Sequence, residues 1–279
     1  MINVSLVLYN NDIKYILNVI KNVIASSFVN KFYLIDNSND TKFSLLAKYD
    51  KRIEYIFNNA NLGYGKAHNI AIRKSIEQNI EYHLVLNPDI YFVPNIIEKL
   101  IKFMNKNRDV GLIMPKVIYP DGQMQYLCKL LPTPFDLLGR RFFSNTPLKK
   151  YIDKRNNIYE LRFSGYNKIM NIPYLSGCFM FFRTEALKDV GLFDERFFMY
   201  PEDIDITRRI HRKYKTIYYP EVSIIHDHAA ESYKNLKMLK IHMINICKYF
   251  NKWGWFFDKE RKQINNEVLK TLNYKGNIQ

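Results

Sequence analysis

The amino-acid sequence predicts an α/β protein, in which a mostly parallel sheet is flanked by helices and followed by a C-terminal helical extension. Over residues 1–110, short apolar runs alternate with segments whose apolar residues recur at helical spacing. Polar residues follow every apolar run, as is typical of parallel strands that present ligand-binding loops at their carboxyl ends. A late segment, residues 234–249, places apolar residues and lysines on opposite faces of an expected helix.

The elements of residues 1–110 are expected in a regular order. Apolar runs predict strands at residues 4–8, 31–35, 53–57 and 82–86. Helical spacing predicts helices at residues 13–24, 43–49, 66–78 and 94–105.

From residue 111 the pattern is less regular. Strands are expected at residues 112–118 and 174–183, a short helix at 184–190, and a further helix that opens at Pro201-Glu202-Asp203. Residues 130–171 are expected to be irregular, as in a lid or acceptor loop. We therefore expect a domain over residues 1–230, whose pattern changes at about residue 110, and a basic amphipathic extension over residues 231–279.

The composition is that of an ordinary globular protein, with 47% hydrophobic and 25% charged residues. No apolar run approaches the roughly 18 residues of a membrane span. The first residues, MINVSLVLYNND, lack the basic region and cleavage site of a secretory signal. Cys128, Cys178 and Cys247 are widely spaced, which fits a reducing compartment. These features predict a cytoplasmic protein.

The net charge of +15 is the strongest compositional signal. It indicates an anionic partner, such as a phosphorylated substrate, acidic lipid or nucleic acid, unless it only reflects a composition rich in Lys and Asn. The charge is uneven, because basic residues concentrate at 208–215 and 234–252.

Two polar segments follow the second and third expected strands. Asp36, with Asn37, can accept hydrogen bonds from a base or a ribose, or can simply stabilise a turn. Gly63 and Gly65 can let the backbone approach a ligand closely, and the helix that follows can direct its N-terminus at an anion. The alternative for these glycines is a structural turn.

A metal site is the functional interpretation of two later segments. Asp89, in Asn87-Pro88-Asp89, offers the hard oxygen ligand that Mg²⁺ or Mn²⁺ prefers, although the same segment can also initiate a helix. His226 and His228 end another apolar run, and either imidazole can supply a further ligand or lie in solvent.

Acids also crowd the start of the helix expected after Pro201. Glu202, Asp203 and Asp205 can stabilise the positive N-terminal end of that helix. Alternatively, one of them can serve as a general base that takes a proton from an attacking hydroxyl. Asp203 and Asp205 are two residues apart, so they cannot share a helix face.

Taken in order, these segments resemble family 2 glycosyltransferases of the GT-A fold, particularly the bacterial rhamnosyltransferase-like branch. The resemblance spans about residues 3–255. It implies that residues 1–230 form a GT-A catalytic domain, with a donor-binding half at about 1–110 and an acceptor-side half at about 111–230. Its motifs are Tyr9-Asn10, Asp36-Asn37-Ser38, Asn61 to Asn69, Leu86 to Asp89, Gly177 to Met180 with Arg183, Val190 to Phe198, Glu202-Asp203 and His226.

The resemblance implies inversion at the anomeric carbon of a nucleotide-sugar donor. Asp203 would be the catalytic base, beside Glu202. Asp89 would bind a divalent cation, Mg²⁺ or Mn²⁺, that bridges the donor diphosphate, with His226 as a further ligand. The other matching positions would bind the donor: Tyr9, Asn10, Asp36, Asn61, Gly63, Lys66, Asn69 and Asn87.

One position departs from the commonest family pattern. Asn87 stands where many relatives have Asp, so it adds no charge to a metal, but it can still hydrogen-bond a ribose. The Asn-Pro-Asp form recurs in the rhamnosyltransferase-like branch. In that branch the donor would be a dTDP- or UDP-linked sugar, with rhamnose as the leading candidate.

The C-terminal segment predicts a contact with an anionic membrane surface, because a basic amphipathic helix adjoins Trp253, Trp255, Phe256 and Phe257. The alternative is a helix packed on the core. Together with the resemblance, the membrane contact implies a peripheral enzyme at the inner face of the cytoplasmic membrane. Its acceptor would be a glycan or a polyprenyl-diphosphate-linked glycan of a surface polysaccharide.

Three other functions compete with this one. A family member that binds donor without turnover is conceivable because of Asn87. A nucleotidyltransferase would need a glycine-rich basic loop after the first strand, where Tyr9-Asn10-Asn11-Asp12 stands instead. A nucleic-acid-binding protein would fit the charge, but no binding motif accompanies it, so no nucleic-acid partner is expected.

Overall fold

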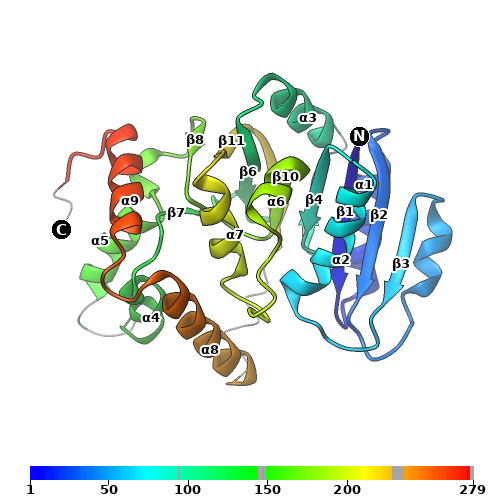
Figure 1. Cartoon of the computed structure of the whole chain (residues 1–279), viewed down its shortest axis with the longest axis horizontal. Coiled ribbons are helices and arrows are strands. Elements are labelled where there is room, and N and C mark those ends of the chain that lie inside the picture. The colour runs from blue at the N-terminus through cyan, green and yellow to red at the C-terminus, as the bar shows by residue number, and fades with distance from the viewer. Residues whose placement is uncertain (94, 144–146, 148, 228–235, 277–279) are drawn as a thin grey trace.

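The computed structural model describes residues 1–93, 95–143, 147, 149–227 and 236–276, and its centre is a twisted sheet (Figure 1). Within the described residues this sheet has nine strands, with β8 paired to β11 beside the order β3-β2-β1-β4-β10-β6-β11-β5. The first four strands are parallel, and β10 lies antiparallel between β4 and β6. The strands are β1 Ile2–Leu8, β2 Val29–Asp36, β3 Ile53–Phe57, β4 Tyr82–Leu86, β5 Ile90–Tyr91, β6 Val110–Ile118, β8 Met170–Asn171, β10 Phe179–Arg183 and β11 Lys215–His226.

Helices cover both faces of the sheet. The side chains of β2 show why: Phe32 and Leu34 join the main core with helix α1, whereas Tyr33 and Ile35 pack with Ala67 of helix α2 on the other face. The helices beside the sheet are α1 Ile13–Ile24, α2 Tyr64–Glu77, α3 Ile96–Lys106, α6 Thr184–Val190 and α7 Glu202–His211, with a 3₁₀ turn, η1 Ser44–Tyr49. The α/β layout expected from the sequence is confirmed.

The expectation of an irregular region at residues 130–171 was wrong. It contains two helices, α4 Pro134–Phe143 and α5 Lys149–Tyr159, and a short 3₁₀ turn, η2 Arg162–Ser164. Pro134 suits the first position of a helix, and Thr133 exchanges hydrogen bonds with Asp136 there. Arg155 of α5 then donates to the same Asp136 carboxylate and ties the two helices together.

The single strand expected at residues 174–183 is also divided. Tyr174–Leu175 forms β9, which pairs with β7 (Cys128–Lys129), and β10 begins only at Phe179. The chain leaves the extended conformation at Gly177, whose backbone N–H donates to a carboxylate of Asp203 at 3.1 Å. This interruption therefore lies at the candidate active site.

The C-terminal segment forms α8 (Leu236–Trp253) and α9 (Lys259–Thr271). The helix expected at residues 234–249 is confirmed from Leu236, since residues 234 and 235 lie outside the described residues, and it ends at Trp253. A second core joins Leu131, Phe197 and Ile204 to Tyr249 and Phe250 of α8.

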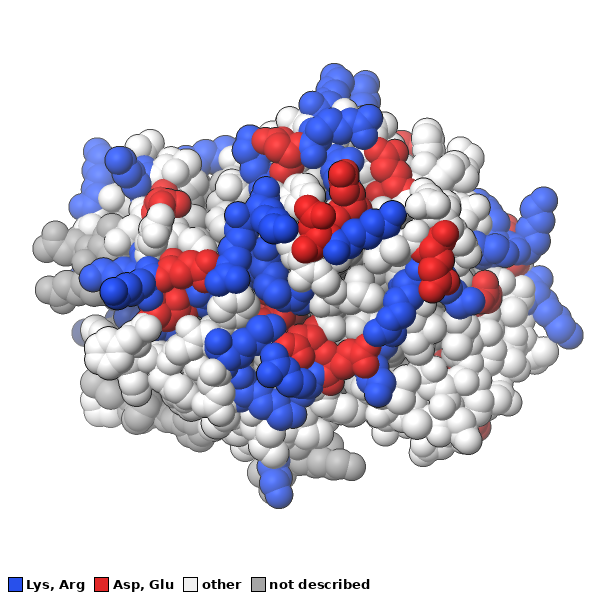
Figure 2. All heavy atoms as spheres, viewed as in Figure 1, with Lys and Arg blue, Asp and Glu red and all other residues white. Residues whose placement is uncertain are grey.

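Two lysines of α8 contact the preceding part of the chain. Lys252 pairs with Asp194 and Asp205, and Lys248 donates to the carbonyl of Arg196. Figure 2 shows Lys and Arg beside Asp and Glu across the middle of this face. No helix in the described part of the chain combines the length and apolar character that crossing a membrane requires.

Candidate active site

Strand pairing brings Asp89 and His226 together. Asp89 precedes β5, and β5 pairs with the end of β11 so that Ile90 lies opposite His226. The backbone N–H of Asp227 also donates to the carbonyl of Asp89 at 3.0 Å. As a result, His226 Nε2 lies 3.4 Å from Asp89 Oδ1, although the residues are far apart in the sequence.

Gln125 fixes the orientation of the His226 ring. Its Oε1 lies 2.9 Å from His226 Nδ1, and its Nε2 donates to the His226 carbonyl at 2.7 Å. An Nδ1–H donated to Gln125 leaves the lone pair of a neutral imidazole on Nε2, which faces Asp89. Burial disfavours the charged ring, but Cys178 and Asp89 act in the other direction and raise the pKa of His226 to about 10. Without a cation the ring is therefore protonated at neutral pH, and a bound cation would take the place of the proton on Nε2.

These residues fit a divalent cation. Asp89 Oδ1 is buried, and it faces His226 Nε2 at 3.4 Å. A carboxylate oxygen and an oriented imidazole nitrogen are both ligands that Mn²⁺ accepts. No group of three or more His, Cys, Asp or Glu side chains suited to a metal occurs in the described ranges. His228, the alternative ligand, lies outside those ranges.

A second pair of carboxylates opens α7. Glu202 and Asp203 are its first two residues and both are buried. Asp203 accepts hydrogen bonds from the backbone N–H groups of Gly177 and Ile204, at 3.1 and 2.9 Å. As the spacing requires, Asp205 faces elsewhere: Trp253 of α8 donates to it at 2.8 Å.

Burial raises the pKa of both carboxyls of the pair. For Glu202, burial and the neighbouring charge of Asp203 raise the pKa to about 8. For Asp203, burial raises the pKa, and the hydrogen bonds from Gly177 and Ile204 oppose the rise. Glu202 therefore favours its protonated form at neutral pH, and the two hydrogen bonds favour the charged form of Asp203.

Gly177 and Cys178 connect the two pairs. Gly177 donates to Asp203, while the next carbonyl, of Cys178, accepts from the backbone N–H of Asn87 at 3.0 Å. The hydroxyl of Tyr64 donates to the Gly177 carbonyl at 2.6 Å. Burial, followed by the charges of Glu202, Cys178, Asp203 and Asp89, raises the pKa of Tyr64 well above its usual range. Tyr64 thus lies among all of these groups.

The glycines before α2 contact the protein's own chain. A Cβ at Gly63 would lie 2.2 Å from the carbonyl oxygen of Phe198, and Gly63 has a φ of +83°. A Cβ at Gly65 would lie 2.8 Å from Phe193. The Phe198 carbonyl also accepts from the backbone N–H of Tyr64 at 2.9 Å. The sequence suggested close approach of a ligand here, whereas the structure places the 193–198 segment against both glycines.

Asp36 and Asn61 hold the loops after β2 and β3. The buried Asp36 carboxylate accepts from the Ser38 N–H at 2.8 Å and the Tyr55 hydroxyl at 2.7 Å. Asn37 donates to Asn61 Oδ1, which also accepts from the N–H of Gly63. In this conformation Asp36 stabilises its turn, the alternative that the sequence left open, and a donor contact stays a prediction.

The remaining expected donor ligands are scattered. Asn87 is half-buried beside Asp89, and Tyr9 and Asn10 are exposed after β1. Lys66 lies 4.0 Å from Glu195 on the outer side of α2. The Asn69 side chain accepts from Phe193 N–H and donates to the Phe193 carbonyl and to Glu195. Because these bonds engage the whole amide, Asn69 fastens the 193–195 segment in this structure.

Sequence reasoning gave no role to four residues that build the site. Gly177 and Cys178 were part of the resemblance, and an interrupted strand would have marked them. Tyr64 was hidden within the glycine segment. Gln125 lies in a turn region about 100 residues from His226, so no local pattern could associate the two.

Comparison with known proteins assigns the class. A family model described as glycosyl transferase family 2 matches residues 4–191, more than half of the chain. The chain therefore belongs to glycosyl transferase family 2, and the resemblance drawn from its motifs is confirmed. The match ends before α7, so Glu202 and Asp203 lie beyond it.

An N-acetylglucosaminyl-diphospho-decaprenol L-rhamnosyltransferase of Mycobacterium tuberculosis is 28% identical over 187 residues. The match covers 62% of this chain and 58% of that protein, so the chain spans about three fifths of the length of this relative. Among solved structures, TarS of S. aureus is similar with a TM-score of 0.57 and 17% identity, over 98% of this chain and 72% of that one.

A mannosyltransferase of Pyrobaculum calidifontis, solved with GDP-Man and Mn²⁺, has a TM-score of 0.58 and 14% identity, over 99% of this chain and 76% of that one. At such identities the likeness concerns the fold, and it confirms the expected GT-A fold.

Proposed function

We propose that the protein is an inverting glycosyltransferase that moves a sugar, rhamnose first, from a nucleotide diphosphate to a hydroxyl of its acceptor, with Asp203 as the base. The observation that carries this proposal is the unequal Glu202–Asp203 pair at the start of α7. Asp203 accepts two backbone hydrogen bonds, and the pKa of Glu202 is raised to about 8, so one carboxylate of the pair is ionised at neutral pH.

The reaction is a single displacement. The acceptor hydroxyl gives its proton to a carboxylate oxygen of Asp203 as its own oxygen bonds to the anomeric carbon of the donor sugar. The bond between that carbon and the diphosphate oxygen breaks, and the nucleoside diphosphate leaves from the opposite face. Because burial raises the pKa of Asp203, the carboxylate is a stronger base than an exposed aspartate.

Asp89 and His226 would hold a divalent cation next to the donor diphosphate. When bound, Mg²⁺ or Mn²⁺ stabilises the negative charge that develops on the leaving diphosphate. Gln125 keeps the imidazole in the orientation that this role requires. The known mannosyltransferase structure with Mn²⁺ supports this assignment.

The relatives support a proposal for the donor and the acceptor. We infer a dTDP- or UDP-linked sugar as donor, and a glycan or polyprenyl-diphosphate-linked glycan of a surface polysaccharide as acceptor. The name of the mycobacterial relative supports a lipid-linked acceptor. The exposed Phe256 and Phe257 support a peripheral location at the inner face of the cytoplasmic membrane.

Asp203→Asn tests the proposal. This variant loses the base, and its single amide oxygen can accept only one of the two backbone hydrogen bonds, so transfer should fall at least about 100-fold while the protein stays folded. Asp121→Asn, in an exposed turn, is the matched control and should keep full activity. The donor is found first from thermal shifts with a panel of nucleotide sugars, with and without Mn²⁺. Full turnover by folded Asp203→Asn would exclude Asp203 as the base, and donor binding without turnover by the wild type would indicate a silent family member.

A further inference from the structure

A cavity lies apart from the Asp89–His226 and Glu202–Asp203 pairs. It has a volume of about 650 Å³, in the range of small-molecule sites, and lies where α4 and α5 approach α9 and the loop before it. Figure 1 shows these three helices gathered at the C-terminal end of the molecule. The apolar lining consists of Leu130, Leu131, Ile158, Tyr159, Leu269 and Tyr274.

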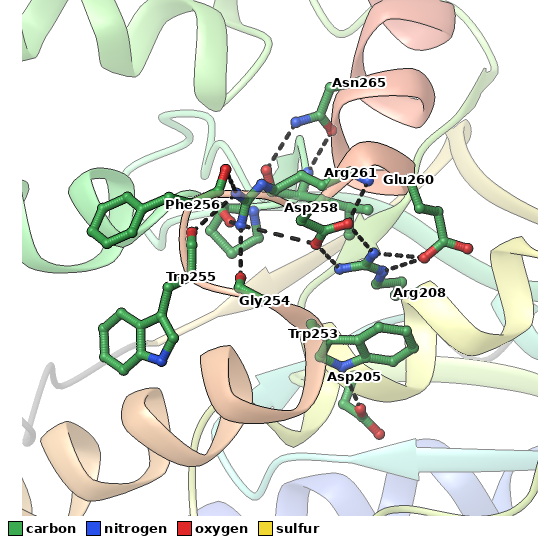
Figure 3. Close-up of polar contacts among 12 residues, drawn as sticks. Asp205, Arg208, Trp253, Gly254, Trp255, Phe256, Asp258, Glu260, Arg261 and Asn265 are labelled. Carbon is green, nitrogen blue, oxygen red and sulfur yellow. Dashed lines mark hydrogen bonds and ion pairs between the residues drawn. The ribbon is translucent and has the colours of Figure 1, made fainter.

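Exposed aromatic rings extend the apolar lining to the surface. Phe256 and Phe257 both line the cavity and are 75% and 97% exposed. Figure 3 shows the Phe256 ring directed away from the polar network around Arg208. Two adjacent phenylalanines this exposed leave a large apolar area in water, which marks a surface that contacts something apolar.

The charged groups of the cavity divide into two kinds. Arg155 pairs with Asp136, and Arg261 donates to backbone carbonyls, including that of Pro132, so both serve the protein's own structure. Lys259 and Lys262 also line the cavity but are exposed, and neither forms an ion pair with a described acid. The mouth is therefore apolar with two lysines beside it, which complements an apolar chain that ends in an anion.

The cavity adjoins the candidate active site along the chain. Leu130 and Leu131 directly follow Lys129, whose positive charge lowers the pKa of Asp203 against the effect of burial. On the other wall, Asp258 binds Arg208 of α7, the helix that begins with Glu202 and Asp203. The cavity is thus connected to the Glu202–Asp203 pair through β7 on one side.

We propose that this cavity binds the apolar chain of a lipid phosphate, with the phosphate beside Lys259 and Lys262, and so seats a lipid-linked acceptor. That the bound lipid is the acceptor of the reaction rests on the proposed function. Binding itself needs neither donor nor cation, so it is measurable without turnover.

Calorimetry with the whole protein in EDTA tests the proposal with farnesyl diphosphate as probe. We expect saturable binding at least about tenfold tighter than that of inorganic diphosphate or farnesol, because only the complete amphiphile satisfies both parts of the site. UDP should not displace the probe. Displacement by UDP, or equal binding of inorganic diphosphate, would place the probe at the donor site and overturn the proposal.

Two variants locate the binding. Asn266→Trp places a large ring in the cavity from the exposed side of α9, and Phe257→Ser removes a ring without unburying any core. Each should weaken the probe about tenfold, whereas Tyr49→Ser, an exposed aromatic in η1, should not. Unchanged affinity in folded Phe257→Ser and Asn266→Trp would overturn the proposal.

Two further results would distinguish lipid binding in the cavity from a bilayer contact and from the proposed transfer reaction. If the protein binds anionic phospholipid vesicles through Phe257 but does not bind farnesyl diphosphate, the rings contact a bilayer and the cavity proposal fails. If the probe binds as expected but no sugar is transferred under any condition, the cavity proposal stands and the proposed function fails.

Discussion

Glu202 and Asp203 are adjacent in the chain but differ in their electrostatic surroundings. Asp203 accepts the N–H groups of Gly177 and Ile204, whereas Glu202 Oε2 is buried with no hydrogen-bond partner among the described residues. Ionising both would place two like charges in a buried site. One proton shared by the pair is therefore the favoured state at neutral pH, and the hydrogen bonds from Gly177 and Ile204 favour Asp203 as the ionised member.

Glu202 should make stability fall as the pH rises. In the unfolded chain its pKa is about 4.5, and in the folded protein burial and Asp203 raise the pKa to about 8. Below about pH 4.5 both states bind the proton. As the pH rises from about 4.5 towards about 8, only the folded state still binds the proton, so the stability that this proton provides decreases. Above about pH 8 neither state binds the proton, and this contribution to stability is lost.

Glu202→Gln removes this dependence. We compare the free energy of unfolding of this variant with that of the wild type at two pH values. The variant minus wild-type difference should be more positive at about pH 9 than at about pH 4.5, by at least about 1 kcal/mol, since one pKa unit is about 1.4 kcal/mol. Urea unfolding at the two pH values, in EDTA, measures the difference. A difference independent of pH would contradict the raised pKa.

Gln125 should control metal affinity without touching the metal. Gln125→Leu leaves His226 Nδ1 without its acceptor, and loss of such an orienting partner typically costs 10- to 100-fold in metal affinity. We expect the half-saturating Mn²⁺ concentration, followed by electron paramagnetic resonance, to rise by about that factor. Gln125→Glu restores an acceptor and serves as the matched control. Unchanged Mn²⁺ binding in Gln125→Leu would mean that His226 is not a ligand.

At the scale of elements, α7 is held from its far side by the C-terminal segment. Arg208 of α7 is buried and forms a two-bond pair with Asp258, at 2.7 and 2.8 Å, while the Trp253 ring lies 4.1 Å from its guanidinium (Figure 3). Glu260 also accepts from Arg208 at 2.6 Å. Asp205, in the first turn of the same helix, binds Lys252 and Trp253. Residues 252–260 thus fix the helix that carries Glu202 and Asp203.

Asp258→Asn should destabilise the fold substantially. It leaves the buried Arg208 without a main counter-charge, and breaking a buried pair on one side costs about 3–5 kcal/mol. The loss should be smaller here, about 2–3 kcal/mol, because Glu260 still pairs with Arg208. Asp109→Asn removes one partner of an exposed pair with Lys215 and should cost less than about 1 kcal/mol. If urea unfolding shows the same loss of stability for both variants, the buried pair contributes no more than the exposed one.

The elements that sequence reasoning found are those with local patterns. α1, β3, β4 and α6 occupy the expected residues because apolar spacing alone determines them. α4 was missed because it depends on Thr133 and Asp136 at its start and on Arg155 from another helix. The same distinction holds for the site. Asp89, Asp203 and His226 follow strands or open a helix, and so were visible, whereas Gln125 acts through a contact that only the folded chain makes.

At the scale of the whole molecule, the structure bears on the expected division at residue 230. Residues 1–230 and 231–279 were expected to form a domain and an extension, and that boundary remains a prediction. The second core nevertheless includes Leu131, Phe197 and Ile204 together with Tyr249 and Phe250. Since a domain has its own core, we infer that the extension folds with the catalytic domain as one unit.

Both tryptophans of the chain, Trp253 and Trp255, lie in this extension, so their fluorescence reports on the extension and its contact with α7. Far-ultraviolet circular dichroism reports mainly on the helices and strands of residues 1–230. If the shared core and the Arg208–Asp258 pair couple the two parts, urea unfolding followed by the two signals should give the same midpoint and slope. Asp258→Asn should then shift both midpoints together. A tryptophan transition at lower urea than the dichroism transition would show instead that the extension unfolds on its own, and that α7 keeps Glu202 and Asp203 in place without it.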